Sequence, residues 1–112
     1  ERYAPIAKMI GDESMVARFL EQFRDNFSGA RAVFEGHISD GELEAVYRYA
    51  HQIKGVSGNL RLNDIYEQAQ KVESDFKAAN TVSEASSGDL DRLLSLIDAE
   101  MQFIDIYLGT KS

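Results

Sequence analysis

The stretch of sequence that decides the fold covers residues 50–60 and reads AHQIKGVSGNL. Its apolar residues recur with the 3.6-residue period of an α-helix, and the same period extends back to about Glu42. The stretch places a histidine, His51, on the same helix as two glycines, Gly55 and Gly58. Glycine costs about 1 kcal/mol relative to alanine inside a helix, so we interpret the pair as clearance for another macromolecule that approaches the histidine.

The chain before this stretch predicts one short and one long helix. Pro5 suits the first turn of a short helix, and Gly11 ends it. Asp12 suits the N-cap of a long helix that continues to about Ile38, and a turn follows at residues 39–41. The residues expected on the buried face of the long helix are Met15 or Val16, Phe19, Leu20, Phe23, Phe27, Ala30, Phe34 and Ile38.

The chain from Glu42 onward predicts three further helices. The first covers about residues 42–60, and Asn63 or Asp64 caps the second. Residues 80–88 are polar and small, which indicates a loop, and Asp89 begins the last helix. The residues expected on the three buried faces are Leu43, Val46, Ala50, Ile53, Ser57 and Leu60, then Ile65, Ala69, Val72, Phe76 and Ala79, and then Leu90, Leu93, Leu94, Ile97, Met101, Ile104 and Leu108.

These helices predict an all-α protein, an antiparallel up-down four-helix bundle with a short extra N-terminal helix. A length of 112 residues is typical of one domain. We expect residues 1–11 to form a short capping helix, 12–108 the bundle and 109–112 a frayed tail. We also expect a monomer, because one bundle uses all of the predicted apolar faces.

Composition argues against several classes of protein. The chain has no cysteine, so disulfides, a thiol nucleophile and a cysteine metal site are excluded. A formal net charge of −7 argues against a nucleic-acid binder, and no apolar run approaches the roughly 18 residues of a membrane span. Phe34 and Arg48 stand three residues before the two histidines, so the Glu-x-x-His pairs of a di-iron bundle are absent, and no metal site is expected. No Gly-rich phosphate loop or kinase signature occurs.

His51 is predicted to face solvent near the middle of its helix, opposite the apolar face. At about 100° per residue, the residues within roughly 60° of His51 include Arg48, Lys54, Gly55, Gly58 and Leu62. A neutral imidazole nitrogen is a nucleophile that can carry a phosphoryl group. Lys54 lies one turn further on and is placed to compensate the charge of that group, although an ion pair with a nearby acid is the alternative.

Other polar and small residues have structural alternatives. Gly55 and Gly58 are interpreted as part of a docking surface, with close helix packing as the alternative. Ser57 falls on the buried face and is expected to bond back to the preceding turn. We favour a simple surface position for Glu73 and expect no function for His37.

The run around His51 resembles the histidine-containing phosphotransfer (HPt) domains of multistep phosphorelays. Their signature is His-x-x-Lys-Gly, a small residue or two, a further glycine, and later a helix with an apolar-acidic pair. The matching residues are His51, Lys54, Gly55, Ser57, Gly58 and the pair Val72-Glu73. Members often have an acid or a glutamine near the active histidine at the position of Glu73, which is the alternative to the surface position that we favour for it. The likeness extends over about residues 12–108. Many members carry another glycine at the position of Arg61, and this departure bears on the choice of partner.

The resemblance implies that His51 accepts a phosphoryl group, through Nε2, from the aspartyl phosphate of a response-regulator receiver domain. A second receiver aspartate would then take the group, as in two-component phosphorelays. The resemblance implies no bound cofactor and no ATP-dependent activity, because the receiver would supply Mg²⁺. The residues expected in the docking surface are Arg48, Gly55, Gly58, Arg61 and Leu62.

The context of the chain has two interpretations. The sequence begins at Glu1 rather than Met, so we expect either a free-standing relay protein or the cytoplasmic C-terminal part of a membrane-bound hybrid sensor kinase. The functional alternative is a non-catalytic helical adaptor that docks a signalling partner. Retention of His51 and Lys54 argues against the adaptor.

Overall fold

The computed structural model describes residues 2–85 and 87–111, and every regular element within these residues is helical. This confirms the all-α class. The elements in chain order are α1 (Ala4–Ile10), α2 (Glu13–Phe27), α3 (Ala30–Ser39), α4 (Leu43–Asn59), α5 (Asn63–Ala78), the short 3₁₀ helix η1 (Val82–Glu84) and α6 (Ser87–Lys111).

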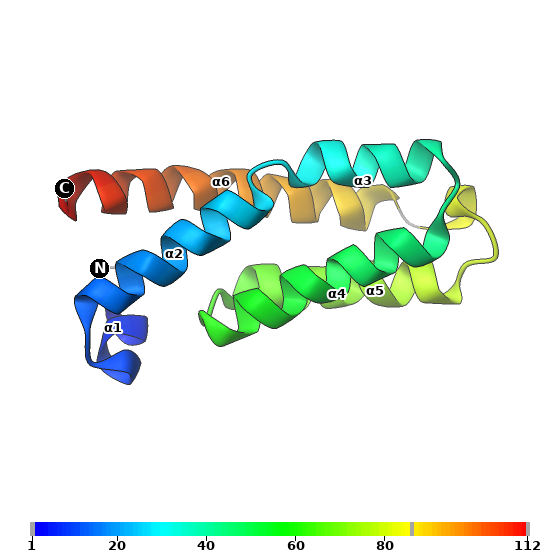
Figure 1. Ribbon diagram of the computed structural model, residues 1–112. Helices are drawn as coiled ribbons and strands as arrows, with labels where there is room; N and C mark the ends of the chain where they lie inside the picture. The colour runs from blue at the N-terminus through cyan, green and yellow to red at the C-terminus, as the bar shows by residue number, and fades with distance from the viewer. Residues whose placement is uncertain (1, 86, 112) are drawn as a thin grey trace.

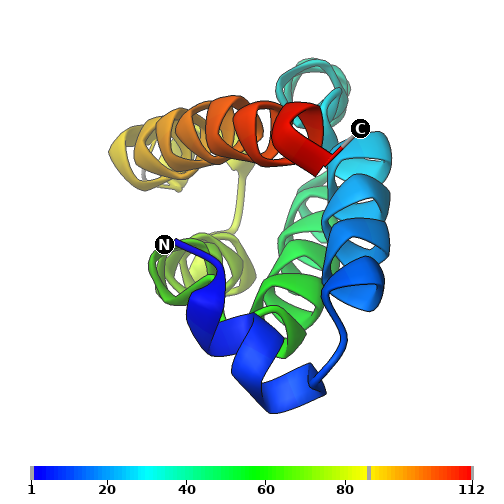
Figure 2. The same cartoon turned by 90° about the vertical axis from the view of Figure 1, so that its left-hand side faces the viewer.

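The helices α2 to α6 lie along the long axis of a molecule that measures 44 × 22 × 18 Å (Figure 1). Helices α2 and α3 run in one direction, and α4 returns beside α3. Helix α5 packs on α4, and α6 packs on both α5 and α2. Figure 2 shows α1 lying across one end of the molecule, where α4 passes into α5. The described helices therefore form a bundle with α4 between α3 and α5.

The predicted single helix from Asp12 to Ile38 is wrong, because α2 ends at Phe27 and α3 begins at Ala30. Ser28 and Gly29 separate the two helices, and a glycine inside a helix weakens it. The break keeps aromatic rings of both helices on α4. The ring of Tyr49 lies edge to face with Phe27 at 6.0 Å and with Phe34 at 5.0 Å.

The helix ends agree with the sequence in part. Helix α1 ends at Ile10, directly before Gly11, which caps it with a left-handed φ of 77°. The Asp12 carboxylate accepts the Ser14 N–H at 2.9 Å, so both predicted signals are confirmed. No side chain caps α5, whose N-cap position is Leu62, so the predicted cap at Asn63 or Asp64 is wrong. The last helix begins at Ser87 and continues to Lys111.

The predicted tail of residues 109–112 is therefore wrong as far as Lys111, and Ser112 lies outside the described residues. The loop predicted at residues 80–88 is shorter than expected, because α6 already begins at Ser87. The loop also contains the short helix η1.

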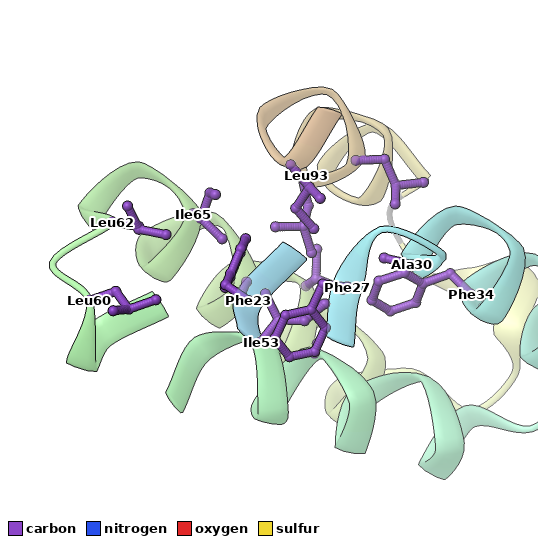
Figure 3. Close-up of a cluster of buried hydrophobic side chains, with 14 of the residues drawn as sticks. Phe23, Phe27, Ala30, Phe34, Ile53, Leu60, Leu62, Ile65 and Leu93 are labelled. Atoms are coloured by element: carbon purple, nitrogen blue, oxygen red, sulfur yellow. The ribbon is translucent and has the colours of Figure 1, made fainter. Parts of the chain in front are cut away.

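The predicted apolar faces make up most of the core (Figure 3). The core also contains Tyr3 and Leu62, which were not predicted there, and the predicted Ala79 is not part of it. Val16 is fully buried, whereas Met15 is 40% exposed, which decides the choice between them. Predicted core residues that pack at the margin, only partly buried, are Phe19, Ile38, Leu43, Met101 and Leu108. Because α4 is buried on the face of Val46, Ala50 and Ile53, its opposite face is left for solvent.

Candidate functional site

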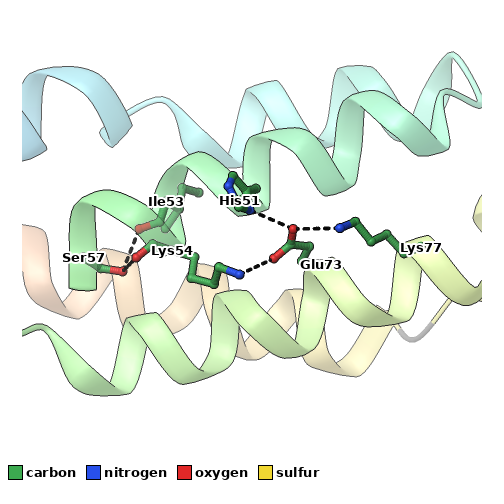
Figure 4. A network of polar contacts seen from close by, with 6 residues as sticks. All are labelled: His51, Ile53, Lys54, Ser57, Glu73 and Lys77. Atoms are coloured by element: carbon green, nitrogen blue, oxygen red, sulfur yellow. Dashed lines mark hydrogen bonds and ion pairs between the residues drawn. The ribbon is translucent and has the colours of Figure 1, made fainter. Parts of the chain in front are cut away.

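His51 lies near the middle of α4 with its side chain 63% exposed, so the predicted outward orientation is confirmed. One of its two ring nitrogens is engaged. Nδ1 lies 2.8 Å from Oε2 of Glu73 on the neighbouring helix α5 (Figure 4). The ring is therefore held by a second helix while its outer edge remains accessible.

Glu73 is the centre of this network, and its predicted surface position is wrong. Its side chain is only 7% exposed, and it also accepts Lys54 Nζ at 2.8 Å and Lys77 Nζ at 3.3 Å (Figure 4). Burial would raise the pKa of Glu73, but the hydrogen bonds from Lys54, His51 and Lys77 outweigh it and lower that pKa to about 2. The carboxylate is therefore ionised at neutral pH.

An ionised carboxylate fixes the proton of the neutral histidine ring. It can only accept hydrogen bonds, so Nδ1 of His51 is the nitrogen that carries hydrogen in this contact. Nε2 then has a free lone pair on the outer side of the ring. The arrangement gives the imidazole one defined nucleophilic nitrogen.

Lys54 and Lys77 approach the same carboxylate from two helices. Lys54 is 22% exposed and forms the ion pair with an acid that was the alternative to phosphate contact. Lys77 is 56% exposed, and its ammonium lies 5.5 Å from the ring centre of Tyr47. Two ammonium groups face one carboxylate, which leaves an excess of positive charge beside His51.

Sequence reasoning did not identify Lys77. The signal available was the i, i+4 spacing of Glu73 and Lys77, which places both on one face of a helix. Nothing in that spacing showed that this face meets His51, because the contact is made between α4 and α5.

The predicted docking residues divide into accessible and inaccessible positions. Arg48 is exposed but forms an ion pair with Glu44 one turn earlier. Gly55 is exposed, and a Cβ there would meet nothing within 4 Å, so the backbone beside His51 is open. At Gly58 a Cβ would lie 3.0 Å from Cδ1 of Tyr66, so close helix packing, the alternative, accounts for this glycine.

Leu62 is only 7% exposed and belongs to the core, so its predicted place in the docking surface is wrong. The helical projection failed because α4 ends at Asn59. The chain reverses there through Arg61, which has a left-handed φ of 58°. The Leu62 N–H donates to Ser57 O at 2.9 Å and the Arg61 N–H to Gly58 O at 3.2 Å, which is the Schellman arrangement.

Arg61 and Ser57 each make a contact that relates to their predicted roles. Arg61 remains exposed, and its guanidinium contacts the Met9 sulfur at 3.4 Å. Ser57 is fully buried and donates to Ile53 O at 2.6 Å, which confirms the bond to the preceding turn.

Two adjoining hollows lie between His51 and α1; the first is lined by His51, and the second by the end of α1. We call them together the α2–α4 groove. The first, of about 530 Å³, is lined by Asn26, Phe27, Tyr49, His51, Gln52, Gly55, Val56 and Asn59. The second, of about 360 Å³, is lined by Met9, Ile10, Phe19, Gln22, Asn26, Val56, Asn59 and Leu60. Asn26, Val56 and Asn59 line both, so the two hollows adjoin.

A third hollow, of about 290 Å³, lies toward α5 and is lined by Tyr47, Arg48, His51, Glu73 and Lys77. Within residues 2–85 and 87–111, no three His, Asp or Glu side chains are grouped so that they could hold a metal ion. None of the described helices is both long and apolar enough to span a membrane.

The site thus consists of an exposed histidine on α4 whose ring is held by a buried acid on α5. A family model described as Hpt domain matches residues 14–102, and the chain belongs to this family. Hpt domains act in histidine phosphotransfer in phosphorelays and interact with receiver domains. Searches among curated proteins and among solved structures found no match.

Proposed function

We propose that His51 accepts a phosphoryl group from the aspartyl phosphate of a receiver domain and passes it to the aspartate of a second receiver. The observation that carries this proposal is the contact between Nδ1 of His51 and the buried carboxylate of Glu73. It leaves Nε2 as the nucleophile on an exposed ring. Membership of the Hpt domain family supports the same chemistry.

In the proposed step, Nε2 of His51 attacks the phosphorus of the acyl phosphate. The N–P bond forms, the P–O bond to the aspartate breaks, and the aspartate leaves as a carboxylate with the electron pair. The Nδ1 proton stays in place, because Glu73 accepts it throughout. The positive charge that develops on the ring is stabilised by that carboxylate. The reverse step, with a second aspartate as nucleophile, regenerates the neutral ring.

Lys54 and Lys77 would compensate charge on the moving phosphoryl oxygens. Both ammonium groups bind Glu73 in the free protein, so the phosphoryl group must compete with that carboxylate for them. Phosphoryl transfer depends mainly on in-line positioning and on such charge compensation. We propose that the receiver contributes the Mg²⁺ that completes this compensation.

The α2–α4 groove is the proposed docking surface for the receiver. Its lining includes apolar side chains, among them Ile10, Phe19 and Val56, and amide side chains such as Asn26. Protein interfaces typically combine apolar and polar residues of this kind. The open backbone at Gly55 lets a partner come close to His51.

The wider context belongs to the same proposal. We propose an antiparallel four-helix arrangement in which α2 and α3 together form one arm, and a monomeric domain that works in the cytoplasm. Such a domain fits both a hybrid sensor kinase and a free-standing relay protein.

The test is incubation with a radiolabelled, phosphorylated receiver and magnesium. The wild-type chain and His37→Gln, which alters the other histidine, are expected to gain an acid-labile, base-stable label. His51→Gln is expected to gain none, and ATP alone should label no variant. The proposal is wrong if no activated receiver labels the wild type, or if His51→Gln is labelled equally. Receiver binding without any label would instead support the adaptor.

A further inference from the structure

A buried carboxylate on α6 ties down the residues that precede α1. Glu100 is only 2% exposed. Its Oε1 accepts Arg2 Nη2 at 2.7 Å, its Oε2 accepts Arg2 Nε at 3.1 Å, and the Tyr3 hydroxyl donates to Oε2 as well. We call Arg2, Tyr3 and Glu100 the N-terminal clasp. The proposed phosphotransfer uses none of these groups.

Packing supports the clasp on both of its donors. Tyr3 is 3% exposed, and its ring lies edge to face with Tyr107 at 5.1 Å. Arg2 stacks on Phe103, with its guanidinium carbon 4.1 Å from the ring centre. Burial, followed by the hydrogen bond to Glu100, raises the pKa of the Tyr3 hydroxyl, so it remains a donor. The clasp therefore joins residues that are far apart in the sequence, because Glu100 lies 98 positions after Arg2 and 97 positions after Tyr3.

The clasp leads directly into one wall of the α2–α4 groove. Helix α1 begins at Ala4, and its last residues, Met9 and Ile10, line that groove. A helix of seven residues has little stability of its own and depends on its tertiary contacts. Besides the clasp, the contacts of α1 include the buried side chain of Ile6 and the contact between Met9 and Arg61.

We propose that Glu100 is a positioning residue for receiver docking: by holding Arg2 and Tyr3 it fixes α1, and α1 completes the docking groove. The inference rests on the proposed function, because it assigns the groove to a receiver. The inference treats receiver docking and the reactivity of His51 as two separate properties of the chain. Loss of the clasp weakens the encounter with a protein partner, whereas the reactivity of Nε2 depends on α4 and α5 alone.

The test compares a protein donor with a small one. Glu100→Gln removes the ion pair, and Tyr3→Phe removes one hydrogen bond while it keeps the buried ring. If α1 occupies its place only about a fifth of the time in a variant, the KM for the phosphorylated receiver rises about fivefold. The kcat and the rate of labelling by phosphoramidate are expected to stay within twofold of wild type. Glu67→Gln, at an exposed acid of α5, is the matched control.

A second measurement reports on α1 in the free protein. The methyl resonance of Met9 is expected to move toward its random-coil position in Tyr3→Phe and Glu100→Gln, while that of Met101 in α6 changes less. An unchanged Met9 resonance in both variants overturns the proposal, and so does equal slowing with receiver and phosphoramidate. If phosphoramidate labels the wild type and no receiver does, the proposed relay fails, whereas the Met9 signal still decides whether the clasp holds α1.

Discussion

Replacing Glu73 with alanine tests the central contact of the site. The substitution removes the carboxylate that accepts the Nδ1 hydrogen of His51 at 2.8 Å. The ring is then free to rotate and to place its hydrogen on either nitrogen. Because only a ring with a free lone pair on Nε2 reacts in the proposed step, we expect slower transfer without a change of chemistry.

The size of the effect follows from the bond that is lost. A hydrogen bond to a charged group contributes about 1.5–3 kcal/mol, and the low end applies because the His51 side chain is 63% exposed. About 1.4 kcal/mol corresponds to a factor of ten in rate. We therefore expect Glu73→Ala to slow transfer about tenfold. Glu73→Gln keeps an acceptor oxygen, and a neutral bond about half as strong predicts a loss of about three- to fourfold.

The assay is single-turnover transfer from a phosphorylated receiver, with nitrogen NMR of the His51 ring on the same samples. The wild type should show hydrogen on Nδ1, and Glu73→Ala should gain the form with hydrogen on Nε2. Glu67→Ala, on the exposed side of the same helix, should match the wild type. An unchanged ring signal together with a rate within twofold of wild type would refute the assigned role of Glu73.

Three further predictions concern the backbone and a carboxyl pair. The hydrogen bond with Asp89, followed by burial, raises the pKa of Asp75 to about 6, so its contribution to stability is complete below its ordinary pKa of 3.8 and is lost as the pH rises through 6. Urea titrations between pH 4 and 7 should therefore show a smaller decline for Asp75→Asn than for wild type. Arg61→Gly should relieve the left-handed φ of 58° and raise the free energy of unfolding by about 1 kcal/mol, which raises Tm by about 4 °C. Gly41→Ala, at a φ of 71°, should lower the free energy of unfolding by a similar amount. Thermal unfolding that shifts Tm in the same direction for both variants would contradict this. Gly55→Ala should stabilise the helix by about 1 kcal/mol in thermal unfolding and yet slow transfer from a receiver more than from phosphoramidate; if both donors react as with wild type, Gly55 has no part in docking.

The helices and the outward direction of His51 could be predicted because both depend on local periodicity. The break between α2 and α3 could not, because Phe27 and Ala30 fit the apolar face of a straight helix as well as they fit two helices. Contacts from another helix decide between these possibilities. Tyr49 packs against rings on both sides of the break.

The site was predictable where its residues share one helix. Lys54 and Gly55 could be placed beside His51 from spacing alone, whereas Glu73 belongs to a different helix, and its burial depends on the pairing of α4 with α5. Leu62 was misplaced because a helical projection has no information about where the helix ends. The left-handed φ of Arg61 marks that end, and a glycine would adopt this φ more readily than an arginine does.

The charges of the site favour a carrier over a store of phosphate. Lys54 and Lys77 together exceed the charge of Glu73 by one unit. A phosphoryl group on Nε2 brings up to two negative charges at neutral pH, and the ring that keeps its Nδ1 hydrogen carries one positive charge, so the proposed phosphorylated site has no excess of positive charge to hold the group. Because Glu73 already binds both ammonium groups, the phosphoryl oxygens on the exposed ring stay accessible to a receiver and its metal ion. Had Glu73 been absent, both lysines would bind the phosphoryl group more tightly, and onward transfer would be slower. On this argument Glu73 has two roles, since it sets the reactive nitrogen and limits how strongly the product is held.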